Sequence, residues 1–474
     1  MSAGVPDSGA ANPRFLRTVV LVTVVTAVGG FLFGFDNGSI SGSVGFLQTR
    51  FDLTPAGVGW VTSSIIVGCI IGVVVAGRLS DAIGRKRVLV LTAAVFLVGA
   101  LGEALAPNDT VLVLARILVG IGIGTETTIA PLYIAEVAPA HIRGRLVSFN
   151  QLFNTVGNLV VFSIAAVIAN LNTEQWNVEY GWRVIFATGL VPAVLFIVLL
   201  RFIPESPRWL AGHGRQVEAL AVLERLTPSA EAAAAQLAEI RSAQSAAGSS
   251  ELRELLRPNL RRALAVGFLV ALFQQITGIN AIFYYAPEIF RSAGLPTTDA
   301  LSSTVLIGVV LVGATLVSLW LIDRVGRRTL LVIGAAAMTV LQAGIGTVFL
   351  APSPSGPLLL ALVLGYVAFF AVSFGTVTYV IISEIFPTRV RGAAASVATF
   401  ALWGGNFFVS QFFPILVDGI GSSATFYLFS AVCLLALVFV LSLVPETKGR
   451  SLEEIERDLH RASSSRAGGG SRRA

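Results

Sequence analysis

The chain has 474 residues, of which 55% are hydrophobic and only 13% are charged, and its mean hydropathy is +0.81. This composition excludes an ordinary soluble domain. The formal net charge of +6 could favour nucleic acid, but the basic residues are distributed over alternating loops and form no single patch. We therefore expect no nucleic-acid partner.

Segments that could cross a membrane recur along the whole chain, since a helix of roughly 20 apolar residues spans a bilayer core. The first is a membrane helix and not a signal peptide, because its apolar run continues through Asp36 without an obvious cleavage site. The sequence predicts an all-α integral membrane protein, surrounded by a lipid bilayer. We predict twelve transmembrane helices, at 15–45, 55–78, 87–106, 110–137, 145–170, 182–203, 259–291, 298–322, 328–351, 357–385, 392–417 and 422–444.

Basic residues mark one side of the predicted membrane. They occupy three loops. Arg85, Lys86 and Arg87 follow the second segment, Arg143 and Arg145 follow the fourth, and Arg324, Arg327 and Arg328 follow the eighth. The intervening loops carry almost none. By the positive-inside rule both termini are cytoplasmic, and we expect a multi-pass protein of the cell inner (plasma) membrane that acts as a monomer.

One long polar segment divides the predicted helices into two groups of six. Residues 205–257 are rich in Ala, Glu and Arg in an amphipathic pattern, which indicates a short cytoplasmic helical linker. We place an N-terminal six-helix bundle at 15–204 and a C-terminal six-helix bundle at 258–445. Residues 1–14 are predicted to be a disordered N-terminal tail and residues 446–474 a cytoplasmic tail, whose end has no apolar residues to bury.

Three short charged motifs of the first half recur in the second half in the same order, which indicates two homologous repeats with parallel topology. Asp81 and Arg85 correspond to Asp323 and Arg327, Glu136 and Arg143 to Glu384 and Arg391, and Glu205 to Glu446. All fall at helix ends on the predicted cytoplasmic side. Arginine–carboxylate bonds there could form a gate that is made in one conformation and broken in another. The alternative is that they are ordinary topology charges and turn residues.

Polar side chains inside the apolar segments predict a binding site. The fifth segment repeats Asn150, Asn154 and Asn158 every four residues, with Gln151 beside them, and such amides should face the bundle interior. The seventh segment carries Gln274, Gln275, Asn280, Tyr284 and Tyr285. A helix break at Gly278 could turn its amides toward one ligand. Uncharged donors and acceptors suit a ligand with many hydroxyl groups; the alternative is hydrogen bonding between helices.

Several longer motifs resemble the sugar porter branch of the major facilitator superfamily, in particular its bacterial proton-coupled xylose, glucose and inositol symporters. They are "GRLSDAIGRKR", "PLYIAEVAPAHIRGR", "PESPRWL", "QQITGINAIFYYAPEIF", "SEIFPTRVRG" and "VPETKGRSLEEIE". The resemblance extends over nearly the whole chain and implies the major facilitator fold. It implies sugar binding by Gln151, Gln274, Gln275, Asn280 and Asn406, with aromatic walls from Tyr284, Tyr285 and Trp403.

Two positions depart from the pattern of the family. Tyr379 stands where many relatives have tryptophan, in a segment that lacks their hinge proline, and Leu402 stands where a xylose-carrying relative has glutamine. We still include Tyr379 among the substrate-binding residues. The departures leave the particular sugar open.

The resemblance also gives a role to charged residues inside the first half. It implies that Asp36 and Arg116 face each other across the first and fourth helices and couple transport to a proton; the alternative is a static ion pair. A buried carboxylate is costly unless it is paired or protonated, and a changing partner can load and release a proton. Glu126 is a second buried acid, which could be a proton relay, a substrate ligand or a residue paired with a polar neighbour.

Together these features predict a secondary active transporter that imports a neutral monosaccharide, either a pentose or a hexose, or a cyclic polyol, by proton symport through alternating access. The alternatives are a facilitative uniporter and a membrane sugar sensor that does not transport. The sequence shows no nucleophile–base pair, metal cluster or phosphate-binding loop. We therefore expect no enzymatic activity, no metal and no cofactor, with the proton as the coupling ion.

Overall fold

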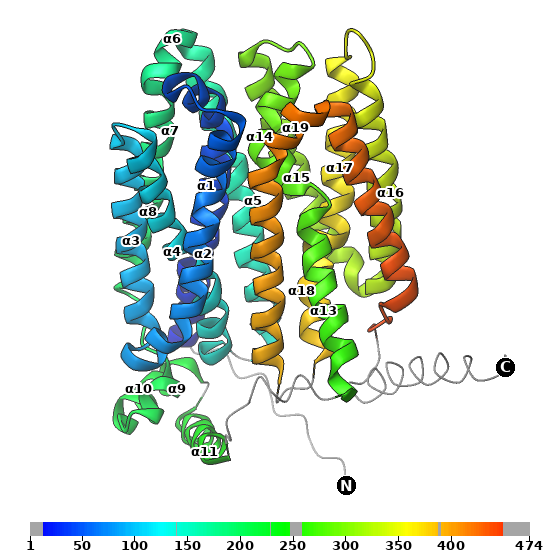
Figure 1. Ribbon diagram of the computed structural model, residues 1–474. Helices are drawn as coiled ribbons and strands as arrows, with labels where there is room; N and C mark the ends of the chain where they lie inside the picture. The colour runs from blue at the N-terminus through cyan, green and yellow to red at the C-terminus, as the bar shows by residue number, and fades with distance from the viewer. Residues whose placement is uncertain (1–12, 139, 228, 247–257, 387–389, 449–474) are drawn as a thin grey trace, which may run out of the picture.

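The computed structural model describes residues 13–138, 140–227, 229–246, 258–386 and 390–448. These residues form helices and no β-strand, as the sequence predicts. The predicted tails lie almost entirely outside the described residues. Figure 1 shows two groups of long helices side by side, with a cluster of short helices below the first group.

The first group contains six crossings. They are α1 (Pro13–Phe51), α2 (Pro55–Ile83), α3 (Arg85–Leu105), α4 (Asp109–Val137), α5 (Ala140–Leu171), and a sixth crossing built from α6 (Glu174–Trp176), η1 (Asn177–Gly181), α7 (Trp182–Thr188) and α8 (Leu190–Leu200). The short helices that follow are α9 (Pro207–Gly212), α10 (Gln216–Leu226) and α11 (Ala230–Ala246). We call the end of the molecule where they lie the linker end.

The second group continues the pattern. It contains α13 (Pro258–Ile276) followed by α14 (Ile279–Ser292), α15 (Thr297–Val325), α16 (Arg327–Val348), α17 (Gly356–Phe370) with η2 (Ala371–Gly375) and α18 (Thr376–Ile385), and α19 (Arg391–Leu443). Eleven stretches of the described residues are long and apolar enough to cross a membrane. The predicted twelfth arises inside α19, where Gly421 has a φ of 83° and a ψ of 160° and interrupts the helix. Glycine adopts a positive φ readily because it has no Cβ atom.

Some boundaries differ from the predicted ones. The first helix continues to Phe51 and the sixth crossing begins at Glu174; both additions are less apolar than the segments they extend. The predicted break at Gly278 is confirmed, because this glycine separates α13 from α14 with a φ of 97°.

Small residues bring the helices of the first half close together and so fix the positions of their polar side chains. A Cβ atom on Gly68 would lie 2.0 Å from the carbonyl oxygen of Ile117, and one on Gly124 would lie 2.0 Å from that of Cys69. Such contacts are typical of packed membrane helices. They bring α2 and α4 into direct backbone contact over several turns.

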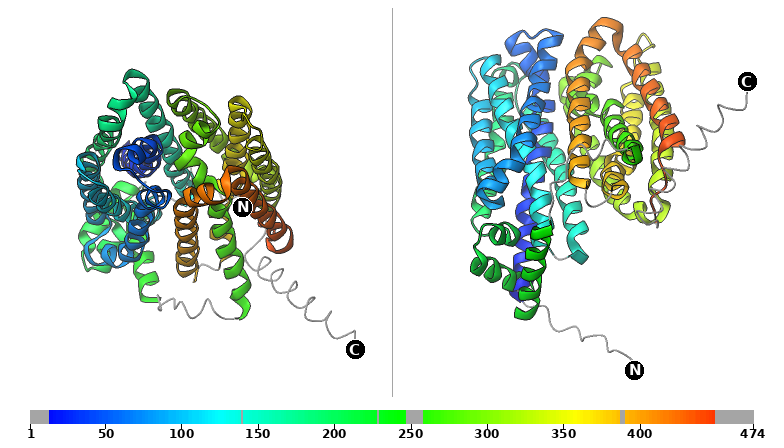
Figure 2. Two further views of the ribbon diagram at one scale, coloured as in Figure 1. Left: turned by 45° about the horizontal axis from the view of Figure 1, so that its top comes forward. Right: turned by 60° about the horizontal axis from the view of Figure 1, so that its bottom comes forward.

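The two halves meet along matching helices. The first half contributes α1, α2 and α5, and these pack against α14, α19 and α15 respectively. The views in Figure 2 show the halves side by side with a gap in the ribbon between them. Any site between the halves is therefore built from both repeats.

Candidate functional site

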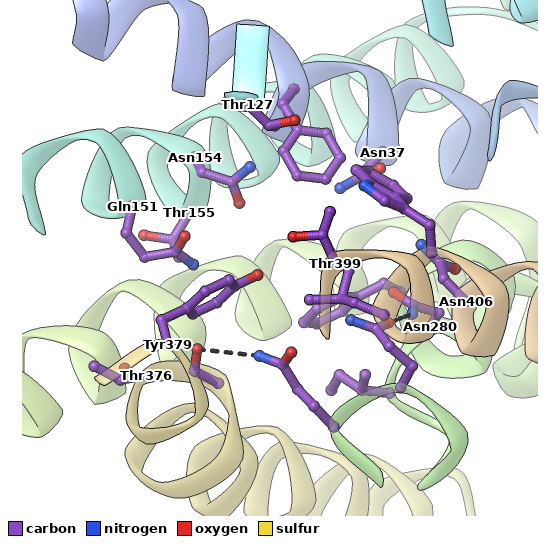
Figure 3. A pocket seen from close by; sticks show the side chains of 18 of the residues that line it. Asn37, Thr127, Gln151, Asn154, Thr155, Asn280, Thr376, Tyr379, Thr399 and Asn406 are labelled. Atoms are coloured by element: carbon purple, nitrogen blue, oxygen red, sulfur yellow. Dashed lines mark hydrogen bonds between the residues drawn. The ribbon is translucent and has the colours of Figure 1, made fainter. Parts of the chain in front are cut away.

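A cavity of about 400 Å³ lies between the halves. Its lining comes from α1, α2, α4 and α5 of the first half and from α13 to α15, α17, η2, α18 and α19 of the second. Figure 3 shows Gln151, Asn154 and Thr155 on one side and Tyr379, Asn280 and Asn406 on the other. None of the described residues that line this cavity carries a formal charge.

Most of the predicted substrate-binding residues line this cavity. They are Gln151, Gln274, Gln275, Asn280, Tyr379, Trp403 and Asn406. The break at Gly278 has the expected consequence, because it brings Asn280 Nδ2 within hydrogen-bonding contact of Gln275 Oε1. Gln274 points another way and donates to the carbonyl oxygen of Phe374, at 3.1 Å.

Tyr284 and Tyr285, which the resemblance predicts as walls of the site, are not among the described residues that line this cavity. Both point from α14 into the helices packed around it. The hydroxyl of Tyr284 donates to Asn37 Oδ1 at 3.2 Å, and that of Tyr285 donates to the carbonyl oxygen of Ser410 at 2.7 Å. The two tyrosines therefore position their neighbours and do not contact the cavity.

Several lining residues were not predicted. Asn37 is an amide inside the first apolar segment, directly after Asp36, and this could have indicated it. The rings of Phe33, Phe283 and Phe370 also line the cavity, and Phe33 lies 5.8 Å from Trp403 between ring centroids. Aromatic rings are common in apolar segments, so these three could not be distinguished from other rings before the structure was known.

Asp36 and Arg116 face each other, as predicted, but they share their site with a third charged residue. Arg116 is fully buried; its Nη2 lies 3.8 Å from Asp36 Oδ2, and its Nη1 lies 3.3 Å from Glu103 Oε1. Arg116 Nε also donates to the carbonyl oxygen of Val61 at 2.8 Å. Glu103 was missed, although a carboxylate within the predicted third segment is the same signal that indicated Asp36.

The unexplained acid Glu126 lies beside the cavity and does not line it. It is 1% exposed and packs so closely on α1 that a Cβ atom on Gly29 would lie 2.2 Å from its Oε1. Asn150 Nδ2 donates to this oxygen at 3.4 Å and to the carbonyl oxygen of Thr26 at 2.8 Å. Of the three roles considered above, the structure displays the pairing with a polar neighbour.

The repeated charged motifs form one cluster in each half at the linker end. In the first, Arg85 bonds both oxygens of Glu136, at 3.0 and 3.1 Å, and lies 3.1 Å from Asp81. Glu205 accepts from the backbone N–H of Lys86 at 3.1 Å. A guanidinium that bonds a carboxylate with two parallel hydrogen bonds gives a strong and directional contact.

The second cluster repeats these contacts. Arg327 lies 3.0 Å from Glu384 and 3.1 Å from Asp323. Glu446 accepts from the backbone N–H groups of Arg327 and Arg328, at 3.0 and 3.1 Å. Burial alone would raise the pKa of Glu446, but these bonds and those from two further backbone N–H groups lower it overall. The side chains of Arg143 and Arg391 lie outside the described residues.

The halves are joined at the end opposite the linker. Ser63 Oγ donates to Gln411 Oε1 at 2.8 Å, and Asn170 Nδ2 lies 3.2 Å from Ser302 Oγ. At the linker end, each ion pair among the described residues of the two clusters stays within one half. Among the described residues, the hydrogen bonds named here that join the halves thus lie at the end opposite the linker.

A further pocket of about 240 Å³ shares Tyr379 and Leu402 with the central cavity and extends along α18.

Two matching helical halves around an uncharged polar cavity define a membrane transporter of the major facilitator fold. The chain belongs to the family of sugar (and other) transporters, whose model matches residues 22–459. It is 41% identical over 452 residues to the arabinose-proton symporter of Bacillus subtilis (strain 168), covering 95% of this chain and 97% of that protein.

Solved structures add information on the conformation. The inward open conformation of the xylose transporter XylE from E. coli matches with a TM-score of 0.82 and 34% identity, covering 93% of this chain and 99% of that one. The proton:xylose symporter XylE bound to 6-bromo-6-deoxy-D-glucose matches with a TM-score of 0.77 and 35% identity, covering 94% and 100%. The family resemblance and the fold predicted from the sequence are confirmed.

Proposed function

We propose that the protein is a secondary active transporter that imports a neutral monosaccharide or cyclic polyol together with a proton. The observation that carries this proposal is the adjacency of two sites on α1. Asn37 lines the uncharged cavity, and the preceding residue, Asp36, belongs to the buried charged cluster with Arg116. A change in the proton on Asp36 therefore acts directly beside the residues that would bind the sugar.

The cavity suits a small sugar. Its volume of about 400 Å³ lies within the usual range for ligand pockets, and its amides, hydroxyls and rings match the hydroxyl groups and apolar faces of a pyranose. We assign the sugar contacts to Gln151, Gln274, Gln275, Asn280, Tyr379, Trp403 and Asn406. A pentose is a good first candidate because relatives carry arabinose and xylose, and hexoses and inositol belong in the same screen.

We place the linker end and both termini in the cytoplasm of a bacterial cell, with the protein as a monomer in the plasma membrane. The basic residues of the two charged clusters lie at that end, as the positive-inside rule requires. With this orientation the structure is inward-facing, in agreement with its higher TM-score against the inward open relative. The two clusters then serve as the cytoplasmic gate, which rearranges when the halves rock.

Transport of labelled sugars into proteoliposomes tests this function. One proton moved through about 100 mV contributes about 2.3 kcal/mol, which corresponds to roughly forty- to fiftyfold accumulation at about 1.4 kcal/mol per factor of ten. We expect accumulation of at least one sugar under an imposed pH gradient, inside alkaline, and only equilibration without it. Equal plateaus under both conditions would identify a uniporter.

Counterflow separates a transporter from a sensor or an enzyme. Vesicles loaded with unlabelled sugar should exchange it for labelled sugar, which a protein that only binds sugar would not do. We propose that the substrate leaves chemically unchanged and that no cofactor besides the proton is needed. Chromatography of the exchanged sugar checks this directly, since a modified product would contradict a pure transport function.

A further inference from the structure

Arg116 interacts unequally with its two carboxylates. Its Nη1 is within hydrogen-bonding distance of Glu103 Oε1, at 3.3 Å, whereas its Nη2 is 3.8 Å from Asp36 Oδ2. Both Asp36 Oδ2 and Arg116 Nη2 are buried without a hydrogen-bond partner in the described part of the chain. In this conformation the guanidinium is thus bonded to Glu103 and only near Asp36.

The charges of this cluster do not balance when both acids are ionised. Two carboxylates and one guanidinium leave a net charge of minus one in a site where all three side chains are less than a tenth exposed, and an unbalanced buried charge is costly. One proton on one carboxylate removes the imbalance. Because Glu103 has the hydrogen bond to Arg116, Asp36 is the carboxylate that can take the proton without breaking a hydrogen bond to the guanidinium.

Among the described residues, the surroundings of Asp36 and Glu103 supply no cation besides Arg116 that is paired with either acid. Cys69 of α2 and Tyr284 of α14 are the nearby titratable groups, and both are neutral near pH 7. Arg183 of α7 donates to the carbonyl oxygen of Ala104, the residue after Glu103, at 3.0 Å. Arg116 is therefore the cation that both acids compete for.

A small cavity adjoins both carboxylates. It measures about 20 Å³ and is lined by Asp36, Glu103 and Ser39 together with apolar residues. This volume is enough for one water molecule. None of its described lining residues lines the central cavity, so a water molecule there would contact Asp36 apart from the sugar site.

We propose that Glu103 is a second carboxylate of the coupling site, which neutralises Arg116 while Asp36 carries the transported proton. Asp36 changes from carboxylate to carboxylic acid on loading and back on release, while Arg116 remains a cation and Glu103 an anion. Glu103 is a positioning residue, because it acts on the proton through Arg116. The inference rests on the proposed proton symport and deepens it.

The test is the pH profile of gradient-driven sugar uptake by Glu103→Gln in proteoliposomes. Without the second anion, the full charge of Arg116 acts on Asp36, which then binds its proton less readily. We expect the pH of half-maximal uptake to move toward acid by about one unit or more, with sugar affinity changed less than about twofold. The matched control is Glu218→Gln, which removes an exposed partner of Arg215 in the linker and should leave the profile in place.

A melting temperature that falls while the pH profile stays fixed would assign Glu103 a structural role only and overturn the proposal. If Glu103→Gln does not fold, Glu103→Asp is the second variant, because it keeps the negative charge on a shorter side chain. It should move the pH profile of uptake toward acid by a smaller amount. An unchanged pH profile for Glu103→Asp would also overturn the proposal. The proposed function itself is tested separately with the wild-type protein. If the wild-type protein does not accumulate sugar under a pH gradient, proton symport is wrong whatever the role of Glu103.

Discussion

The two halves share a fold and a charged cluster at the linker end, yet they differ in what they bury elsewhere. All buried charged side chains among the described residues belong to the first half, as Asp36, Arg85, Glu103, Arg116 and Glu126. All three buried glutamines, Gln274, Gln275 and Gln342, belong to the second. In the function we propose, the repeated helices move as two similar halves. The residues that differ between the halves then do the chemistry: the first half handles the proton, and the second makes most of the polar contacts to sugar.

The strongest test of this division is Asp36→Asn, which should abolish gradient-driven accumulation and retain sugar binding and counterflow. Asparagine resembles the protonated acid and has no proton to release. Because Glu103 still pairs with Arg116 at 3.3 Å, the variant should also fold and insert. Uptake with and without a pH gradient, normalised to folded protein, measures this.

Accumulation by Asp36→Asn equal to that of the wild type would place coupling elsewhere, and Glu126→Gln would be the next variant to assay. The double variant Asp36→Asn with Glu103→Gln is the matched control for folding. It leaves the buried guanidinium without a counter-ion, so its loss of melting temperature should exceed the sum of the two single losses.

A second prediction concerns the sugar contacts of the second half. Gln275→Ala removes the acceptor of Asn280 Nδ2 together with a group that faces the cavity. An unpaired polar group in a dehydrated site costs on the order of 1–3 kcal/mol, so sugar affinity should fall about five- to hundredfold. Binding is measured by titration calorimetry. Proton coupling should persist at saturating sugar, and unchanged affinity would show that the pocket is wrongly placed.

The third prediction tests the tyrosines that the structure moves out of the cavity wall. Tyr284→Phe removes the hydroxyl that lies 3.2 Å from Asn37 Oδ1 and 3.5 Å from Asn406 Nδ2, both of which belong to lining residues. Loss of one hydrogen bond to a positioning group should weaken sugar binding by about two- to tenfold. Tyr285→Phe should have a smaller effect on sugar binding, because the hydroxyl of Tyr285 donates to the carbonyl oxygen of Ser410, which does not line the cavity.

The sequence predicted what depends on local composition, and it missed what depends on packing. Segments of high hydropathy and the break at Gly278 are properties of neighbouring residues, and both were found. The direction in which Tyr284 points depends on which face of α14 meets α1. The contact between Glu103 and Arg116 depends on the register of α3 against α4, which the sequence alone does not fix.

The smallest predicted effect concerns Glu446, which belongs to the charged cluster at the linker end of the second half. Four backbone N–H groups hold this carboxylate ionised and lower its pKa below the ordinary value of 4.5. A lowered pKa means that the stabilisation is fully present above the unfolded value and is lost as the pH falls through the folded value. Glu446→Gln should therefore lower the melting temperature by a constant amount between about pH 5.5 and 7.5, and the difference should shrink as the pH falls below about 4.5.

The matched variant in the first half is Glu205→Gln, since Glu205 accepts from the backbone N–H groups of Lys86 and Ser206, at 3.1 and 2.8 Å. With two such donors in place of four, its loss of melting temperature should be the smaller of the two. Neither variant removes a group that faces the cavity or Arg116, so both should keep the pH profile of sugar uptake. A shift of that pH profile by Glu446→Gln would show that the repeated charged clusters take part in proton coupling. The division proposed here, in which the repeated clusters serve movement and the residues that differ between the halves serve chemistry, would then be wrong.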